Sequence, residues 1–195
     1  MENLDSDLTL EPARTAVLLI DLQRRIVELP TAPHSGPDVV TRATALAAAH
    51  RAAGALVVSV RVDRPGVTEQ PPGSELVPEA APLAGDLPVV KHTWGAFHET
   101  GLDAALRERR IDTLVLTGIA TNFGVEQTAH FADELGYRVV LPEDAMTGLD
   151  AHAHAFAFEY VFPRLGTVCR TDDVLAALGG TGRGDTQESP FRATS

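Results

Sequence analysis

Apolar residues along this chain form short runs of aliphatic side chains, separated by longer segments in which apolar positions recur at helical spacing. The runs predict strands at residues 16–20, 56–61, 113–116, 138–141 and 166–169. The segments between them predict helices at residues 39–53, 102–109, 122–135 and 151–161. This alternation predicts an α/β fold, in which a single parallel sheet carries helices on both faces.

The distribution of apolar residues also predicts the domain organisation. Residues 16–20 and 113–116 are nearly continuous in Val, Leu and Ile, so we expect strands buried on both faces at the centre of the sheet. A chain of 195 residues with 44% hydrophobic side chains suits one domain, at residues 14–178. Polar composition predicts a flexible segment at 1–13 and a disordered tail at 179–195. The long, Pro-rich connection 63–88 is typical of a lid, an interface arm or a disordered loop.

Charge and cysteine usage narrow the classes of partner. The formal net charge of −11 argues against nucleic acid and anionic membranes, because phosphate binding depends on clustered Lys and Arg. No apolar run approaches the roughly 20 residues that span a bilayer, and the first residues lack a signal-peptide pattern, so we expect a cytoplasmic protein. The single cysteine, Cys169, cannot form an intramolecular disulfide and lies in an apolar run typical of a buried thiol.

Candidate chemistry gathers where predicted strands end. Asp21 directly follows the first strand, at the edge where open parallel sheets bind their ligands. Lys91 follows the apolar pair Val89-Val90; by itself it would be an ordinary surface charge. From Gly118 to Gly124 the chain passes from a strand through a tight turn into a helix, whose first N–H groups favour negative charge. The alternative for this turn is a glycine-rich segment kept for packing.

These segments resemble those of one known superfamily. Ile20-Asp21-Leu22-Gln23, Val90-Lys91 ahead of Trp94-Gly95-Ala96-Phe97, and Gly118 to Val125 occur in the order found in the isochorismatase-like hydrolases, also called cysteine hydrolases. The resemblance implies a Rossmann-like three-layer fold, Asp21 and Lys91 as catalytic residues, and a non-proline cis peptide between Ile119 and Ala120. It also implies that the backbone N–H groups of Ala120 and Gly124 form an oxyanion hole.

The family's catalytic cysteine corresponds to Gly124 in this chain, which leaves three interpretations. Glycine provides room for a bulky ligand, permits hydrolysis without a covalent intermediate, or marks a loss of activity. Relatives that cleave isochorismate also carry glycine here, so we favour vinyl-ether hydrolysis with protonated Asp21 as the acid. Lys91 opposes that protonation. Water-mediated amide hydrolysis by ionised Asp21, and an inactive ligand-binding protein, therefore stay open.

Side chains around these segments are candidate contacts for a small-molecule substrate: Gln23, Arg61, Trp94, Phe97, Thr121, Asn122 and Phe123. Trp94 and Phe97 would form aromatic walls, although lid or subunit packing also accounts for them. Arg61 would meet a substrate carboxylate through two hydrogen bonds, or form a structural ion pair. Gln23 and Asn122 are better suited to holding the backbone than to reacting.

We expect no metal or other cofactor. Metal-dependent relatives carry Asp-x-His-x-x-His after the second strand, whereas this chain has Asp63-Arg64-Pro65-Gly66-Val67-Thr68. His152 and His154, two residues apart, would diverge on a helix and do not match a zinc pair. The resemblance implies a homo-oligomer, a dimer or tetramer, to which the 63–88 connection would contribute.

Overall fold

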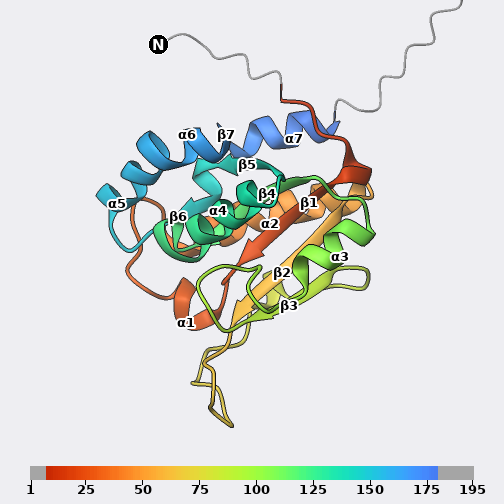
Figure 1. The fold of residues 1–195 in the computed structure, drawn as a ribbon. Coiled ribbons are helices and arrows are strands. Elements are labelled where there is room, and N and C mark those ends of the chain that lie inside the picture. Colours follow the sequence, from red (N-terminus) through yellow and green to blue (C-terminus); the bar gives the residue numbers. More distant parts are fainter. Residues whose placement is uncertain (1–7, 180–195) are drawn as a thin grey trace, which may run out of the picture.

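A computed structural model describes residues 8–179, and its centre is a seven-stranded parallel sheet (Figure 1). The strands are β1 (Thr15–Ile20), β2 (Leu56–Val62), β3 (Leu87–Lys91), β4 (Thr113–Ile119), β5 (Arg138–Pro142), β6 (Met146–Thr147) and β7 (Gly166–Cys169). Their order is β3-β2-β1-β4-β5-β7, and β6 pairs with the end of β4. The predicted central positions of β1 and β4 are confirmed, and every residue of both strands is buried.

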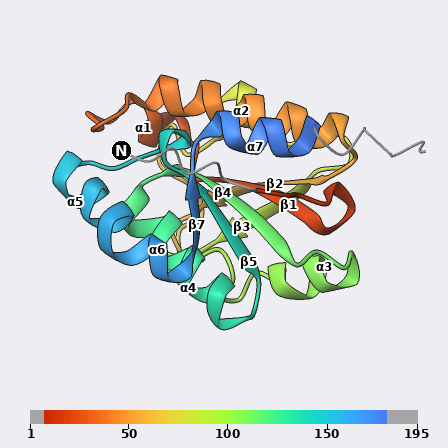
Figure 2. The ribbon, with the colours of Figure 1, turned by 90° about the horizontal axis from the view of Figure 1, so that it is seen from above.

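Helices cover both faces of the sheet, as predicted. They are α1 (Arg24–Val27), α2 (Gly36–Ala52), α3 (Leu102–Glu108), α4 (Glu126–Glu134), α5 (Ala151–Phe156), α6 (Phe162–Leu165) and α7 (Thr171–Gly179). Figure 2 shows α2 and α7 above the sheet, with α3, α4 and α6 below it. The α/β fold class predicted from the sequence is therefore confirmed.

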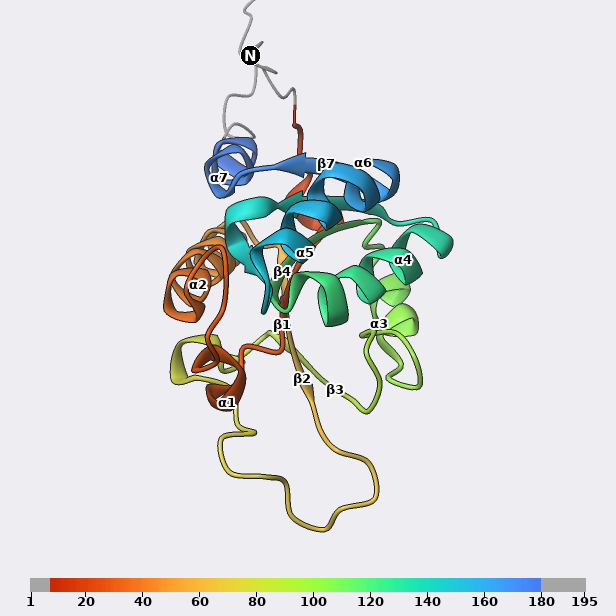
Figure 3. The same cartoon turned by 90° about the vertical axis from the view of Figure 1, so that its left-hand side faces the viewer.

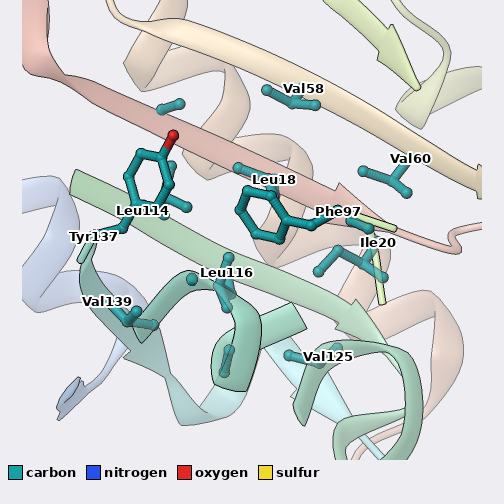
Figure 4. Packing of buried hydrophobic residues seen from close by; sticks show 14 of the residues in the cluster. Leu18, Ile20, Val58, Val60, Phe97, Leu114, Leu116, Val125, Tyr137 and Val139 are labelled. Atoms are coloured by element: carbon teal, nitrogen blue, oxygen red, sulfur yellow. The ribbon is translucent and has the colours of Figure 1, made fainter. Parts of the chain in front are cut away.

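Successive side chains of β1 supply two separate cores, because neighbouring residues of a strand point to opposite faces. Leu18 and Ile20 belong to the core beneath α3 and α4, where Phe97 and Tyr137 also pack (Figure 4). Val17 and Leu19 belong to the other core, together with apolar residues of α2 and α7. This division explains why the β1 sequence is continuously apolar rather than alternating.

Several elements differ from their predicted form. The helix predicted at 122–135 begins as a π-helical turn, Thr121–Val125, and continues as α4. The helix predicted at 151–161 consists of α5 and a second π-helical turn, Ala157–Val161, which runs on into α6. The strand β3 was not predicted because it is short, contains Pro88, and lies at the sheet edge with several side chains partly exposed.

The flexible segment predicted at 1–13 does not apply to residues 8–13. Leu8 and Leu10 are buried in the core beside α2, which fixes this part of the chain against the domain. At the other end, Gly179 closes α7, whereas the remainder of the predicted tail, 180–195, lies outside the described residues, as does 1–7. Part of the connection between β2 and β3, residues 63–86, extends away from the sheet in Figure 3, whereas Ala80 within it packs in the core beside α2. Within residues 8–179, no helix is long and apolar enough to cross a membrane.

Candidate active site

The ends of β1, β3 and β4 bring the candidate catalytic residues together at one edge of the sheet. Asp21 leaves β1 in the left-handed backbone region, with φ 56°, which Asp tolerates better than most residues. Its backbone N–H is held by the carbonyl of Val60 in β2, and Gln23 donates to its carbonyl. Lys91 ends β3, and Gly124 lies in the turn that follows β4. The predicted convergence of these residues is present.

Asp21 and Lys91 form a buried ion pair. The Lys91 Nζ lies 2.8 Å from the Asp21 Oδ2, and the two residues are 1% and 5% exposed. Lys91 also donates a hydrogen bond to the backbone carbonyl of Trp94, which fixes the ammonium group in place. The second carboxylate oxygen of Asp21, Oδ1, is buried and has no hydrogen-bond partner. Buried polar atoms are normally paired, so an unpaired Oδ1 at this position is unusual.

The protonation of Asp21 results from two opposing effects. Burial disfavours the ionised carboxylate and raises the pKa of Asp21 from 3.8 to about 6. The charge and hydrogen bond of Lys91 act in the opposite direction but do not cancel the effect of burial. Asp21 therefore titrates close to neutrality, where a group can both donate and accept a proton.

Gly124 adjoins the ion pair so closely that a side chain there would contact both partners. A Cβ atom built at Gly124 would lie 2.9 Å from Asp21 Oδ2 and 2.9 Å from Lys91 Nζ. Both atoms are ends of flexible side chains, so a larger residue would displace the pair rather than the backbone. The carboxylate and the ammonium group therefore lie where a side chain at position 124 would begin.

A cavity of about 360 Å³ opens onto this pair. Its wall includes Asp21, Lys91, Ala120, Gly124, Trp94 and Phe123. The peptide between Ile119 and Ala120 is cis, as the resemblance implied. Because Ala120 and Gly124 both line the cavity, the proposed oxyanion hole is placed where a substrate would enter, although its role stays a prediction.

The aromatic candidates divide between the cavity and the core. Trp94 and Phe123 stack at 5.0 Å with an interplanar angle of 25°, and both line the cavity. Phe97 does not: it is 9% exposed and packs against Tyr137 in the core beneath α3 and α4 (Figure 4). The prediction that Phe97 contacts substrate is therefore wrong, because the chain after Trp94 turns its next aromatic side chain inward.

Arg61 and Gln23 have structural roles instead of lining the cavity. Arg61 Nη2 lies 3.0 Å from Asp63 Oδ2, so the structural ion pair replaces the predicted contact with a substrate carboxylate. Gln23 is fully buried; its side chain donates to the carbonyls of Val62 and Ser74 and accepts from Val62 N–H. It joins the start of the 63–86 connection to the first strand.

Thr121 and Asn122 also lie outside the cavity. Thr121 is fully buried, and its hydroxyl is 2.8 Å from Nδ1 of His154 in α5. This contact corrects the prediction that Thr121 binds substrate, since its only polar side-chain atom is already engaged. Asn122 borders a neighbouring groove on the other side of Trp94 and Phe123. Its side-chain oxygen is buried without a partner.

A second cluster of titratable side chains lies behind the π-helical turn Thr121–Val125. The ring Nε2 atoms of His34 and His154 are 3.2 and 3.1 Å from the same oxygen of Glu143, whose other oxygen accepts from Arg170. The atoms of His34, Glu143 and His154 that could bind a metal ion lie within 4.8 Å of one another. Hydrogen bonds and ion pairs already account for this arrangement. The sequence did not reveal it, since His34 and Glu143 are 109 residues apart.

Sequence reasoning also missed most of the cavity's apolar wall, which consists of Ile26, Leu29, Val62, Ile119 and Leu149. Leu29 and Leu149 lie in short loops and Ile26 lies in the four-residue helix α1, so none of the three belongs to a periodic apolar pattern. A usable signal existed for Val62 and Ile119, which are the last residues of β2 and β4 at the edge that already carried Asp21.

We expect a Gly124→Cys variant to react with a thiol-directed reagent much faster than the wild-type protein does. The new thiol would lie beside the Lys91 ammonium and at the start of a helix, which both lower the pKa of a cysteine and oppose the effect of the neighbouring Asp21 carboxylate. The native Cys169 is 7% exposed, and burial raises its pKa to about 12. Equal modification rates for the variant and the wild type would contradict this geometry, and the Cys169→Ser background removes the remaining thiol.

Comparison with known proteins gives a consistent result. The sequence model of the isochorismatase domain matches residues 15–173. The chain is 39% identical over 187 residues to the uncharacterized isochorismatase family protein YecD of Escherichia coli O157:H7, covering 88% of this chain and all of that protein. It is 37% identical over 141 residues to streptothricin hydrolase of Streptomyces noursei, covering 71% of this chain and 51% of that protein.

Solved structures give the same fold. An isochorismatase family protein from Burkholderia thailandensis superimposes with a TM-score of 0.79 at 41% sequence identity, and the match covers 88% of this chain and 98% of that one. A cysteine hydrolase from Pseudomonas syringae superimposes with a TM-score of 0.78 at 24% identity, so it supports the fold alone.

Proposed function

The chain belongs to the isochorismatase family, and from this premise we propose that it hydrolyses a small molecule with Asp21 in place of a cysteine nucleophile. One observation carries the proposal: the buried Asp21–Lys91 pair borders a substrate-sized cavity, while Gly124 offers no nucleophile. The raised pKa of Asp21 supports a role in proton transfer at neutral pH.

The favoured reaction is acid-catalysed hydrolysis of a vinyl ether. Protonated Asp21 donates its proton to the terminal carbon of the vinyl group, leaving an oxocarbenium ion on the adjacent carbon. Water adds to that carbon and returns a proton to Asp21; the hemiketal then collapses to a carbonyl compound and an alcohol. With a pKa of about 6, about one molecule in ten carries the necessary proton at pH 7.

The second candidate is hydrolysis of an amide or ester by an activated water. The 2.8 Å contact with Lys91 favours ionised Asp21, which would take a proton from the attacking water. The Ala120 and Gly124 N–H groups would stabilise the oxyanion. We expect slow turnover by this route, because water replaces the covalent step that a thiolate provides.

The dependence of kcat/KM on pH distinguishes the two reactions. We would follow isochorismate, an uncharged enol ether and a panel of small amides between about pH 5 and pH 9. Vinyl-ether hydrolysis by protonated Asp21 predicts a rate that falls about tenfold per pH unit above pH 6, whereas activation of water by ionised Asp21 predicts a rise that levels off there. Silence on every substrate at every pH would overturn the enzymatic proposal in favour of a ligand-binding protein.

We also propose a cytoplasmic homo-oligomer without a cofactor. The family resemblance supports the oligomer, and the 63–86 connection provides an extended arm that another subunit would cover (Figure 3). Light scattering combined with size-exclusion chromatography tests this, and a monomer at micromolar concentration would contradict it.

A further inference from the structure

The charged side chains on the cavity wall are paired with each other, so none of them is free to bind an ionic substrate. Asp21 and Lys91 are the fully charged residues of the lining, and they neutralise each other at 2.8 Å. His92 also lines the cavity, but its ring Nδ1 lies 3.1 Å from the backbone oxygen of Asp63. While Asp21 is ionised, an entering carboxylate therefore finds no unpaired cation on this wall; when Asp21 is protonated, the Lys91 ammonium keeps its hydrogen bond to the Trp94 carbonyl.

Neither of the nearby arginines, Arg61 and Arg25, places a charge on the cavity wall. Arg61 is engaged with Asp63 and does not line the cavity. Arg25 lowers the pKa of Asp21 less than Lys91 does; its Nε is buried without a hydrogen-bond partner, but the residue is absent from the cavity wall. A charged group that loses its water without gaining a partner is strongly disfavoured, and the net charge of −11 repels anions further.

The remaining wall is suited to an apolar molecule. Ile26, Leu29, Val62, Ile119 and Leu149 supply aliphatic surface, and the stacked Trp94 and Phe123 supply aromatic surface. Leu29 and Leu149 are 41% and 48% exposed, so a ligand in the cavity would cover apolar surface that water now contacts. A small number of polar groups among apolar walls is typical of sites for small, uncharged ligands.

One polar atom defines what the ligand must carry. Asp21 Oδ1 is buried without a partner, so an uncharged N–H or O–H group would satisfy it, and protonated Asp21 would in turn bind an acceptor. We propose that the substrate is a predominantly apolar molecule, uncharged at the end that enters the cavity, with a polar group placed against Asp21. This inference rests on the proposed function for its site and excludes dianionic substrates such as isochorismate.

The protein contains a built-in reporter for the test. Trp94 is the single tryptophan of the chain and lines the cavity, so its fluorescence responds when a ligand enters. We would titrate benzamide, benzoate and benzamidine, which share a shape but are neutral, anionic and cationic. We expect benzamide to bind at least about tenfold more tightly than either ion. Equal or tighter binding of benzoate or benzamidine would overturn the proposal.

A variant pair confirms where the probe binds. Leu149→Arg places a cation on an exposed part of the cavity wall, so we expect benzoate affinity to rise at least about tenfold there. Leu83→Arg is the matched control, because Leu83 is 59% exposed and lies outside the cavity wall; it should leave all three affinities unchanged. Failure of Leu149→Arg to gain benzoate binding, or silence of every probe, would contradict the proposed cavity.

The binding test is independent of turnover. It measures the affinities of benzamide, benzoate and benzamidine for the wild-type protein, whether or not any of them is hydrolysed. A protein that prefers benzamide but hydrolyses nothing would retain this inference and refute the proposed reaction. A protein that hydrolyses isochorismate and binds benzoate best would support the proposed reaction and refute this inference.

Discussion

Asp21→Asn is expected to lower kcat/KM by about 10²- to 10⁴-fold on whichever substrate the pH series identifies. The amide has nearly the shape of the carboxylate but cannot exchange a proton near neutrality. Both proposed reactions pass through that proton, so both should fail. The measurement is steady-state turnover of wild type and variant at about pH 6, where the wild-type carboxyl is about half protonated.

The variant has a structural consequence that must be separated from the chemical one. Lys91 is 1% exposed, and without Asp21 its charge would be buried with no counter-ion. Removing one partner of a buried ion pair typically costs about 3 to 5 kcal/mol, whereas replacing both with apolar groups is often neutral. The double variant Asp21→Asn/Lys91→Met leaves no buried charge, so it should recover much of the stability that Asp21→Asn loses and still lack activity.

A matched control tests whether any buried acidic residue has the same effect. Asp63 is 8% exposed and paired with Arg61, but it does not line the cavity. We expect Asp63→Asn to retain activity within about a few-fold of wild type. If Asp21→Asn and Asp63→Asn lose turnover equally, or if the folded double variant keeps wild-type rates, Asp21 is not the proton donor or acceptor.

Some features of the fold and the site follow from the order of residues in the sequence, whereas others depend on how individual side chains are oriented. The positions of β1 and β4 follow from continuous apolar runs, and the place of Asp21 beside the turn from Gly118 to Gly124 follows from parallel strands that end at one edge. These inferences need only sequence order and no knowledge of individual side-chain orientations. Lys91 joins the site through the family resemblance, because the short strand before it, β3, has no clear apolar pattern.

The errors arise where orientation decides the outcome. Trp94 and Phe97 are three residues apart, and no local pattern distinguishes the one that lines the cavity from the one that packs on Tyr137. The partner of Arg61 is Asp63, two residues along the same chain, so a structural pair forms before any substrate arrives. Thr121 makes its contact with His154, from a helix whose position depends on the whole fold.

Gly118→Ala is expected to lower the free energy of unfolding by about 3 kcal/mol or more, a large fraction of the total for a domain of this size. Gly118 lies in β4 opposite Ile20 and has φ 123°, a backbone conformation that side chains rarely adopt. A Cβ atom there would overlap the carbonyl oxygen of Ile20 and approach its backbone nitrogen within 2.9 Å. These are backbone atoms of a central strand, so neither can move away cheaply. Chemical denaturation of the two proteins measures the difference.

The cost at Gly118 combines backbone strain with a steric clash, and Gly54→Ala separates them. Gly54 also has a positive φ, 76°, but a Cβ atom there would have no neighbour within 4 Å, so about 1 to 2 kcal/mol is expected. The excess at Gly118 then reports contact between β1 and β4. Because Ile20 immediately precedes Asp21, any relaxation that relieves this contact should also displace the carboxylate. Equal losses in the two variants would show that the strands separate easily, and that the position of Asp21 does not depend on the absence of a side chain at Gly118.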